Sequence, residues 1–370
     1  MKGSVGKMGK FSNLGEIVEE FSIESGALPY GNGHINDTFV ITSHPKYILQ
    51  RINTEIFKSP DELMENIERV TVAIKKKLVE NGKNPQRGTL TIVKTKNGQN
   101  YFRAKDGSCY RVFHFIDEAV SYDRVESDSI LYGAAKAFGE FQKMLSDFDA
   151  SLLHETIPDF HNTPKRLENL KASIAADKAG RRESVKEEID FALSFEGDIS
   201  TVTDGLADGS IPLRVTHNDT KINNVLIDPL TGEGVCVIDL DTVMPGSLLY
   251  DFGDGLRTGG ALADEDERDL TRPGISIPLF KSYTKGFLAG IGDSITEKER
   301  ELMPYSVFLL TYECGIRFLT DYLDGDVYFK THRQNHNLDR ARAQFAMCRD
   351  ILKKQSELKK AVADAYAKAR

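Results

Sequence analysis

The order of hydrophobic and polar residues changes character along the chain, near residue 117. Before that point, short runs rich in β-branched and aromatic residues, bounded by turn formers, predict strands at 36–42, 46–53, 88–97, 100–106 and 108–117. Apolar residues at helical spacing predict helices at 13–23 and 59–78. The second of these begins at Ser59 with Pro60 in its first turn, which is a common helix start.

Two dipeptides with a strong turn preference separate the last three predicted strands. Asn97-Gly98 comes before the strand at 100–106, and Asp106-Gly107 follows it. Such pairs adopt the backbone conformation that tight turns between strands need. A turn is therefore expected at each place.

From about Ser127 onward, helical spacing prevails, and it predicts helices at 129–145, 164–195, 295–323 and 338–369. The one strong strand signal in this part is 223–240, which predicts a hairpin. At 370 residues the chain exceeds the usual size of a single core. We therefore predict an α+β fold with two lobes: a small, mostly antiparallel sheet in residues 1–116 and a larger, mostly helical lobe in residues 117–370.

The composition of the chain limits the classes of partner that it is expected to bind. The formal net charge of -8 disfavours nucleic acid and anionic membranes, since both select basic surfaces. No apolar run approaches the roughly 20 residues of a membrane-spanning helix, and the first 20 residues lack the apolar segment of a signal peptide. A small-molecule partner and a cytoplasmic location are expected. The four scattered cysteines form no C-x-x-C pair and are expected to be buried free thiols.

The segment RVTHNDTKINNVLID carries the candidate chemistry. His217, Asp219 and Asn224 have the spacing H-x-D-x-x-x-x-N of a kinase catalytic loop. Phosphoryl transfer needs a carboxylate that orients and deprotonates the acceptor hydroxyl, and an oxygen ligand for Mg²⁺ on the nucleotide phosphates. Asp219 suits the first role and Asn224 the second.

The predicted hairpin supplies further metal ligands. If residue 228 pairs with residue 235, Asn224 lies opposite Asp239, and opposed side chains have Cβ atoms roughly 4.5 to 5.5 Å apart. Their oxygens would then share one hard cation such as Mg²⁺. On an extended chain Asp241 faces the same side as Asp239, which makes Asp241 a candidate second ligand.

The literal Asp-Phe-Gly at 251–253 competes with this interpretation, because kinases hold Mg²⁺ with the Asp of that triplet. Nothing in the hairpin brings Asp251 back to Asn224. We predict instead that Asp251 braces the catalytic loop through its backbone N–H groups.

The residues expected to bind the nucleotide are less clearly marked in the sequence. Gly31 and Gly33 would let a loop approach phosphates closely, although the chain has no Walker A motif. Arg51 is the candidate phosphate-binding cation, with Glu65 or Glu68 as its partner, or else an ordinary surface ion-pair residue.

Five segments of the chain together resemble the N-acetylhexosamine 1-kinases of the aminoglycoside phosphotransferase and choline kinase superfamily. They are GNGHINDTF, ILQRIN, MENIERVT, THNDTKINN and CVIDLDTVMPG. The resemblance implies a two-lobed protein-kinase-like fold, ATP and Mg²⁺ as cofactors, and transfer of the γ-phosphate to the anomeric hydroxyl of GlcNAc or GalNAc.

The resemblance also implies roles for single residues. It makes Asp219 the catalytic base that contacts the reacting hydroxyl, and Asn224 and Asp239 the Mg²⁺ ligands. The adenine is expected against backbone groups of the segment Phe113, His114, Phe115 and Ile116. From the likeness, in part with composition, we infer sugar contacts at Thr242, Arg317 and Tyr328, and closure of the site from above by His34, Asn36 and Asp37, of which His34 and Asn36 are also candidate sugar contacts.

Alternatives stay open. Glu313, Arg317 and Asp321 stand four residues apart, so they could form a salt-bridge ladder on a helix. The acceptor could be an aminoglycoside, choline or homoserine, because the motifs for ATP chemistry would be identical. A non-catalytic nucleotide-binding module is the third hypothesis, and the presence of Asp219, Asn224 and Asp239 argues against it.

Overall fold

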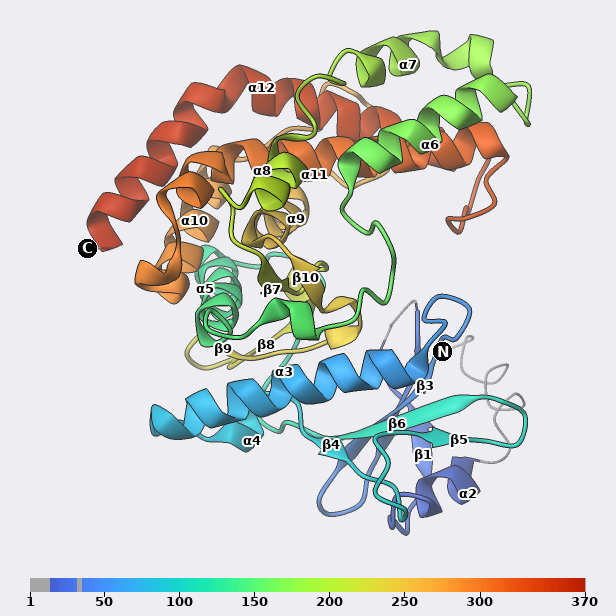
Figure 1. The fold of residues 1–370 in the computed structure, drawn as a ribbon, viewed down its shortest axis with the longest axis vertical. Helices are drawn as coiled ribbons and strands as arrows, with labels where there is room; N and C mark the ends of the chain where they lie inside the picture. The colour runs from blue at the N-terminus through green and yellow to red at the C-terminus, as the bar shows by residue number, and fades with distance from the viewer. Residues whose placement is uncertain (1–13, 32–34, 370) are drawn as a thin grey trace. The chain divides into compact units, whose positions relative to one another are not determined.

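The computed structural model describes residues 14–31 and 35–369, so the predictions for Gly33 and His34 fall outside the described residues. The chain divides into two compact units (Figure 1). The N-terminal unit contains Met1–Glu118 and Leu153–Ile157, and the C-terminal unit contains Ala119–Leu152 and Pro158–Arg370.

The N-terminal unit is built on an antiparallel sheet in the order β1-β2-β3-β6-β4, with β5 also paired to β6. Its strands are β1 (Ala27–Pro29), β2 (Asp37–Ile41), β3 (Tyr47–Ile52), β4 (Ile92–Val93), β5 (Phe102–Arg103) and β6 (Cys109–His114). The strands predicted at 36–42, 46–53 and 108–117 are confirmed as β2, β3 and β6. The other two predicted strands shrink to two residues each.

The turn at Asn97-Gly98 exists, but it does not join paired strands. Gly98 has φ +76°, and the turn is closed by a bond from Thr95 N to Gln99 O of 2.9 Å. The expected turn is therefore confirmed, while β4 pairs with β6 instead of β5. At Asp106-Gly107 the expectation is confirmed, because β5 pairs with β6 across that turn.

Three helices accompany this sheet: α2 (Leu14–Glu19), α3 (Pro60–Glu80) and α4 (Pro85–Gly88). Helix α3 starts as predicted, with the Ser59 hydroxyl accepting a bond from Glu62 N. Helix α2 ends at Glu19, earlier than predicted, and the chain leaves it through tight turns that finish at Ser22 with φ +59°. Phe21 and Ile23 still pack into the core of the sheet. The returning segment Leu153–Ile157 is tied to α3 by two hydrogen bonds between Asn66 and the backbone of His154, of 2.8 and 2.9 Å.

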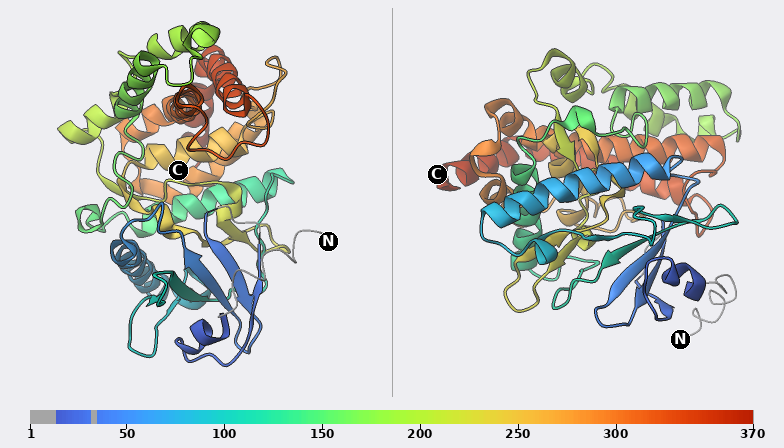
Figure 2. Two further views of the ribbon diagram at one scale, coloured as in Figure 1. Left: turned by 90° about the vertical axis from the view of Figure 1, so that its right-hand side faces the viewer. Right: turned by 60° about the horizontal axis from the view of Figure 1, so that its bottom comes forward.

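Helices make up most of the C-terminal unit (Figure 2). They are α5 (Asp128–Met144), α6 (Thr163–Ala176), α7 (Lys186–Leu193), α8 (Thr201–Asp208), α9 (Leu248–Gly259), α10 (Ile277–Ile291), α11 (Glu297–Asp324) and α12 (His336–Ala369). The predicted helix at 164–195 is broken into α6 and α7, because Asp177 adopts a left-handed conformation with φ +40°. The other three predicted helices are present. The α+β class with a helical second part is confirmed.

Helices α5 and α10 approach each other closely because glycines line their contact. A Cβ atom on Gly139 would lie 2.2 Å from Phe287 O, and one on Gly290 would lie 2.2 Å from Lys136 O. No side chain fits at either position without moving a backbone. These glycines therefore set the distance between two helices of the core.

Two small strand pairs carry the segment that holds the candidate chemistry. The predicted hairpin is confirmed as β8 (Val225–Ile227) and β9 (Gly234–Val237). The sequence analysis missed a second pair, β7 (Arg214–Thr216) with β10 (Met244–Gly246). Together they fix both ends of the loop at residues 217–224.

All four cysteines are free thiols, and Cys109, Cys236 and Cys348 are buried as expected, while Cys314 is half-buried. Among the described residues, no helix combines the length and the apolar character needed to cross a membrane.

The glycine contact makes a stability prediction. Gly139→Ala should lower the free energy of unfolding by about 2 kcal/mol or more, since overpacking against a backbone outweighs the better helix propensity of alanine. The measurement is urea denaturation followed by circular dichroism. Gly197→Ala is the matched control, because a Cβ there meets nothing within 4 Å. Equal stability of both variants would contradict this account of the helix contact.

Candidate active site

The loop after β7 is held by a buried carboxylate from α9. Asp251 Oδ2 accepts hydrogen bonds from His217 N at 3.0 Å and from Gln142 Nε2 at 2.6 Å, and its Oδ1 accepts one from Asn218 N at 2.8 Å. The Asp251 side chain is wholly buried, and burial raises its pKa against the lowering effect of His217 and the N–H donors. The expectation that Asp251 braces the loop through backbone N–H groups is confirmed.

A second carboxylate, one turn farther along α9, continues this bracing. Asp254 Oδ2 accepts the backbone N–H of Thr220 at 3.1 Å, while the Thr220 hydroxyl donates to the backbone oxygen of Asp251 at 2.6 Å. Sequence reasoning missed Asp254. The available signal was its spacing, since residues three apart on a helix share a face and Asp254 follows Asp251 by three.

His217 anchors the start of the loop from inside the core. Its Nε2 donates to Ile238 O at 2.9 Å, and its Nδ1 accepts the backbone N–H of Asp219 at 3.3 Å. The ring meets Phe138 and Phe141 edge-on. The histidine of the motif thus connects the loop to the end of the hairpin and shapes the backbone at Asp219.

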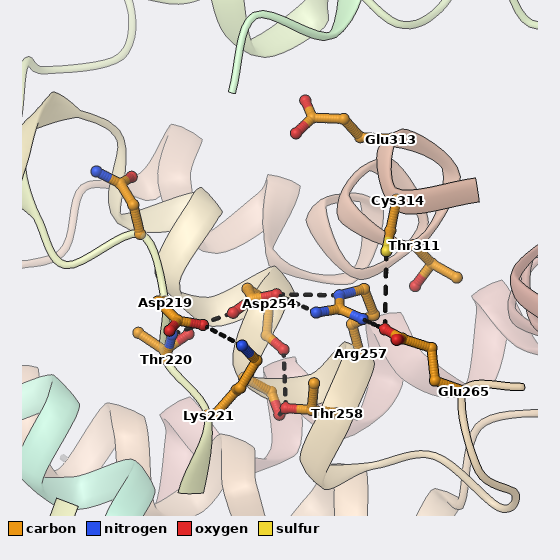
Figure 3. A network of polar contacts seen from close by, with 12 residues as sticks. Asp219, Thr220, Lys221, Asp254, Arg257, Thr258, Glu265, Thr311, Glu313 and Cys314 are labelled. Carbon is orange, nitrogen blue, oxygen red and sulfur yellow. Dashed lines mark hydrogen bonds and ion pairs between the residues drawn. The ribbon is translucent and has the colours of Figure 1, made fainter. Parts of the chain in front are cut away.

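Asp219 has one donor on each carboxylate oxygen, and Figure 3 shows the one from Lys221. Lys221 Nζ lies 2.8 Å from Oδ1, and Asn224 Nδ2 lies 3.1 Å from Oδ2. The Asp219 side chain remains 24% exposed, in contrast to the buried Asp251. Lys221 is a residue that the sequence analysis missed, although it lies only two positions after Asp219. Burial opposes its charge, but Asp219 and Asp254 raise the pKa of Lys221.

The register of the hairpin differs from the expected one. Val225 pairs with Val237, and a bulge between Leu226 and Ile227 shifts the pairing toward the turn. Asn224 therefore lies opposite Ile238, whose N–H donates to Asn224 O at 2.9 Å, and the predicted pairing with Asp239 was wrong by one residue.

The chain beyond the hairpin is also not extended. Asp239 adopts φ +59°, and Leu240–Thr242 form a short 3-10 helix, so the alternation argument for Asp241 does not apply. Asp239 is exposed, whereas Asp241 is buried. The metal roles of Asn224, Asp239 and Asp241 stay predictions.

The side-chain oxygens of Asn224 and Asp239 are nevertheless suitable ligands for Mg²⁺. The amide nitrogen of Asn224 is used by Asp219, which leaves its oxygen as the group for a cation, and Asp239 adds a carboxylate at the adjoining end of β9. Mg²⁺ is usually held by one or two carboxylates together with substrate phosphates. The described residues contain no cluster of three or more histidine, cysteine or acidic side chains placed for a metal.

Thr242 lies beside the loop but binds the protein itself. Its hydroxyl donates to His217 O at 2.6 Å, and its backbone oxygen accepts from Asn218 Nδ2 at 2.8 Å. Asn218 needs this support, because it adopts φ +65°. The predicted sugar contact of Thr242 would have to use the remaining lone pair of its hydroxyl.

The helix that carries Arg317 does not form the salt-bridge ladder considered above. Glu313 receives bonds from His161 Nδ1 at 2.8 Å and Thr163 Oγ1 at 2.6 Å. Asp321 accepts the backbone N–H groups of residues 327–329 at 2.7 to 2.9 Å. Arg317 lies over the rings of two phenylalanines, Phe160 at 5.9 Å and Phe329 at 5.6 Å.

These contacts link Arg317 to the loop in two steps. Phe160 stacks edge-on against His161, and His161 Nε2 lies 3.4 Å from Asn218 O, next to Asp219. Tyr328, 69% exposed, packs edge-on against Phe329. Arg317 and Tyr328 thus both pack against the ring of Phe329. Their predicted contacts with a sugar stay predictions.

In the N-terminal unit, Arg51 contacts Asp37, a carboxylate that the sequence analysis had considered for the sugar site and not as the partner of Arg51. Asp37 Oδ2 lies 3.5 Å from Arg51 Nη1, on the neighbouring strand. Glu65 forms an ion pair with Arg69, and Glu68 forms one with Lys94. The pairing of Asp37 with Arg51 was not predicted, because cross-strand pairing depends on register.

Two other predicted contacts in this unit have local roles. Asn36 Oδ1 accepts the backbone N–H of Asn53 at 3.0 Å, and Gly31 adopts φ +70°, as its turn requires. His114 and Phe115 already donate their backbone N–H groups to Thr91 O and Lys46 O, at 2.9 and 3.1 Å. An adenine ring would therefore have to find its N–H donor elsewhere, such as at Ile116.

A cavity of about 750 Å³ opens in the C-terminal unit beside the loop. Lys221, Ile222 and Asn223 form one wall, and the end of α9 with residues 261–274 forms another. Its size lies within the range of small-molecule sites. Arg317 and Tyr328 do not line it.

Comparison with known proteins agrees with this geometry. A model of the phosphotransferase enzyme family matches residues 26–274, more than half of the chain. Among solved structures, the chain is similar to the microcompartment-associated aminopropanol kinase, with a TM-score of 0.58 and 11% identity over 94% of this chain and 98% of that one. It is also similar to an aminoglycoside phosphotransferase from Alicyclobacillus acidocaldarius, with a TM-score of 0.56 and 14% identity over 96% and 95%.

A third similar structure is the amicoumacin kinase hAmiN in complex with AMP-PNP, Ca²⁺ and Ami. Its TM-score is 0.57, with 11% identity over 95% of this chain and 93% of that one. At these identities the likeness concerns the fold. The kinase-like fold that the resemblance implied is confirmed.

The brace from α9 leads to a testable consequence. Asp251→Asn should lower the free energy of unfolding by about 2 to 4 kcal/mol, because an amide nitrogen would face N–H donors in a buried place. Asp228→Asn is the matched control, since Asp228 also accepts two backbone N–H groups, from Leu230 and Thr231, but in an exposed turn. That control should lose less than about 1 kcal/mol. Similar losses in urea denaturation would contradict a special role for Asp251.

Proposed function

This chain belongs to the phosphotransferase enzyme family, and from that premise we propose that it transfers the γ-phosphoryl group of ATP to the anomeric hydroxyl of an N-acetylhexosamine, GlcNAc or GalNAc. The products are the sugar 1-phosphate and ADP. The observation that carries the phosphotransfer is the carboxylate of Asp219, partly exposed and flanked by Lys221 and Asn224, on a loop whose backbone is held from α9.

In this proposal Asp219 accepts the proton of the sugar hydroxyl while that oxygen bonds to the γ-phosphorus. The bond between the γ-phosphorus and the bridging oxygen breaks, and ADP leaves. Positioning of the reactants and electrostatic stabilisation of the phosphoryl group supply most of the catalysis in such reactions. Asn224 and Asp239 would hold Mg²⁺, which neutralises charge on the phosphates when bound.

The charges of the side chains around Arg317 favour a neutral acceptor there. The buried carboxylate of Glu313 is already satisfied by His161 and Thr163. Burial opposes its charge, but His161 lowers the pKa of Glu313. Arg317 and the half-buried Arg166 add positive charge nearby, and burial together with Arg317 lowers the pKa of Arg166. An ammonium group would find no unoccupied carboxylate among these residues, whereas hydroxyl and acetamido groups would find donors.

One observation favours a second candidate, a kinase of the same fold that phosphorylates an amino alcohol or aminoglycoside. The cavity beside Lys221 is lined by six acidic and four basic residues. The acidic excess, which includes Asp123, Glu126 and Asp128, suits a cationic acceptor. The aminopropanol kinase and aminoglycoside phosphotransferase with the same fold make this class worth testing.

An acceptor panel tests both candidates. Purified protein with ATP and Mg²⁺ should release ADP with GlcNAc or GalNAc, more than with choline, aminopropanol, homoserine or aminoglycosides. Asp219→Asn should lower kcat by about 10²-fold to 10⁴-fold, the usual contribution of a general base. Release with an amine and none with an N-acetylhexosamine would reject the sugar assignment and keep the kinase.

The predicted acceptor contact of Arg317 has its own test. Arg317→Met should raise the KM for the sugar by about tenfold, and leave the KM for ATP within about twofold, because a lost hydrogen bond to a bound ligand costs about 1 to 2 kcal/mol. Arg340→Met is the matched control, since Arg340 also lies over a phenylalanine ring, Phe318, at 5.3 Å. An unchanged sugar KM in the Arg317 variant would remove this contact from the proposal.

A further inference from the structure

Arg257, in the last turn of α9, forms ion pairs with two carboxylates, one at each end of its guanidinium (Figure 3). Its Nε and Nη2 lie 3.0 and 2.9 Å from Asp254 Oδ1, and its Nη1 lies 2.9 Å from Glu265 Oε1. The Arg257 side chain is only 9% exposed. Because Asp254 also accepts Thr220 N, one guanidinium connects the segment that carries Glu265 to the peptide next to Asp219.

Charges alternate along this chain of contacts. Asp219 pairs with Lys221, Lys221 is attracted to Asp254, and Asp254 pairs with Arg257. Burial opposes the charge of Asp254, but Arg257 and Lys221 lower its pKa. If Arg257 lost its charge, Asp254 would attract Lys221 more strongly, and the ion pair between Lys221 and Asp219 would weaken.

Glu265 is the end of the network that lies farthest along the chain from Asp219, and it contacts solvent. Its side chain is 42% exposed, and it lies in the segment 261–274 that forms one wall of the cavity beside Lys221. A displacement of that wall would move the partner of Arg257. The geometry of the cavity and that of the loop are therefore mechanically connected through two charged groups.

We propose that Arg257 is a positioning residue, which holds Asp254 on the backbone of the catalytic loop and ties that loop, through Glu265, to the wall of the cavity. The role of Arg257 in turnover rests on the proposed phosphotransfer, whereas its hold on Thr220 does not. A guanidinium is required because it alone offers several donors in a fixed fork, which a lysine cannot reproduce.

Kinetics of three variants test the proposal. Arg257→Met should lower kcat by about 10²-fold while the KM for ATP stays within about twofold, since only the chemical geometry changes. Arg257→Lys should restore part of this loss, because it keeps a charge beside Asp254. Glu265→Gln should lower kcat by about fivefold and, being partly exposed, should leave the midpoint of thermal unfolding unchanged. Adding Glu265→Gln to Arg257→Met should cost nothing more, as expected for two residues acting through one contact.

Arg182→Met is the matched control, because Arg182 forms an ion pair with Glu183, is 45% exposed and does not line the cavity. Its kcat should equal that of the wild type. A wild-type kcat in Glu265→Gln, or equal losses in the Arg182 control, would overturn the link through Glu265. Should Arg257→Met fail to fold, Arg257→Lys and Glu265→Gln still decide the question.

Hydrogen exchange gives a readout that needs no acceptor. In Arg257→Met and Glu265→Gln, the peptide that contains Thr220 should exchange its amide hydrogens faster than in the wild type, because the bond to Asp254 is weakened. Peptides from α10 should not change. Unchanged exchange at Thr220 would overturn the proposal. If the wild-type protein phosphorylated no acceptor of the panel, the proposed function would fail, yet this exchange experiment would still test the hold of Arg257 on the loop.

Discussion

Two buried carboxylates on helix α9 hold a loop by its backbone N–H groups, and the geometry of the candidate site depends on that hold. Asp251 accepts the N–H groups of His217 and Asn218, and Asp254 accepts that of Thr220. A loop with a residue at φ +65° would otherwise be free to relax. Buried charges are stable only when they are paired or hydrogen-bonded, so loop and helix stabilise each other.

The fold explains why such a costly arrangement persists. Strands β7 and β8 fix the two ends of the loop, and Gln142 of α5 adds a third donor to Asp251. Helix α5 is in turn held against α10 through glycines that admit no side chain. The loop at residues 217–224 therefore rests on close-packed helices, which transmit displacements and leave little room for adjustment.

The choice of acceptor depends on other side chains than phosphotransfer does. Structures of the same fold with 11 to 14% identity include kinases named for aminopropanol, an aminoglycoside and amicoumacin, so the fold accommodates varied acceptors. In this chain two regions border the loop with different charge. One contains Arg317 and a satisfied Glu313, and the other is a cavity with several carboxylates and the Arg257–Glu265 pair. Function on such a scaffold follows from these side chains.

The sequence by itself determined the main strands of the first part and the long helices of the second, the position of the loop between His217 and Asn224, and the bracing role of Asp251, since spacing along the chain encodes these features. It did not determine that Asn224 faces Ile238, because the pairing beside the hairpin turn joins Ile227 with Gly234 and not residue 228 with residue 235, nor that Asp37 contacts Arg51. Only the tertiary structure decided the partners of Asp254, Arg257 and Glu313. These partners lie on separate elements, and a contact between distant segments depends on packing that no local pattern records.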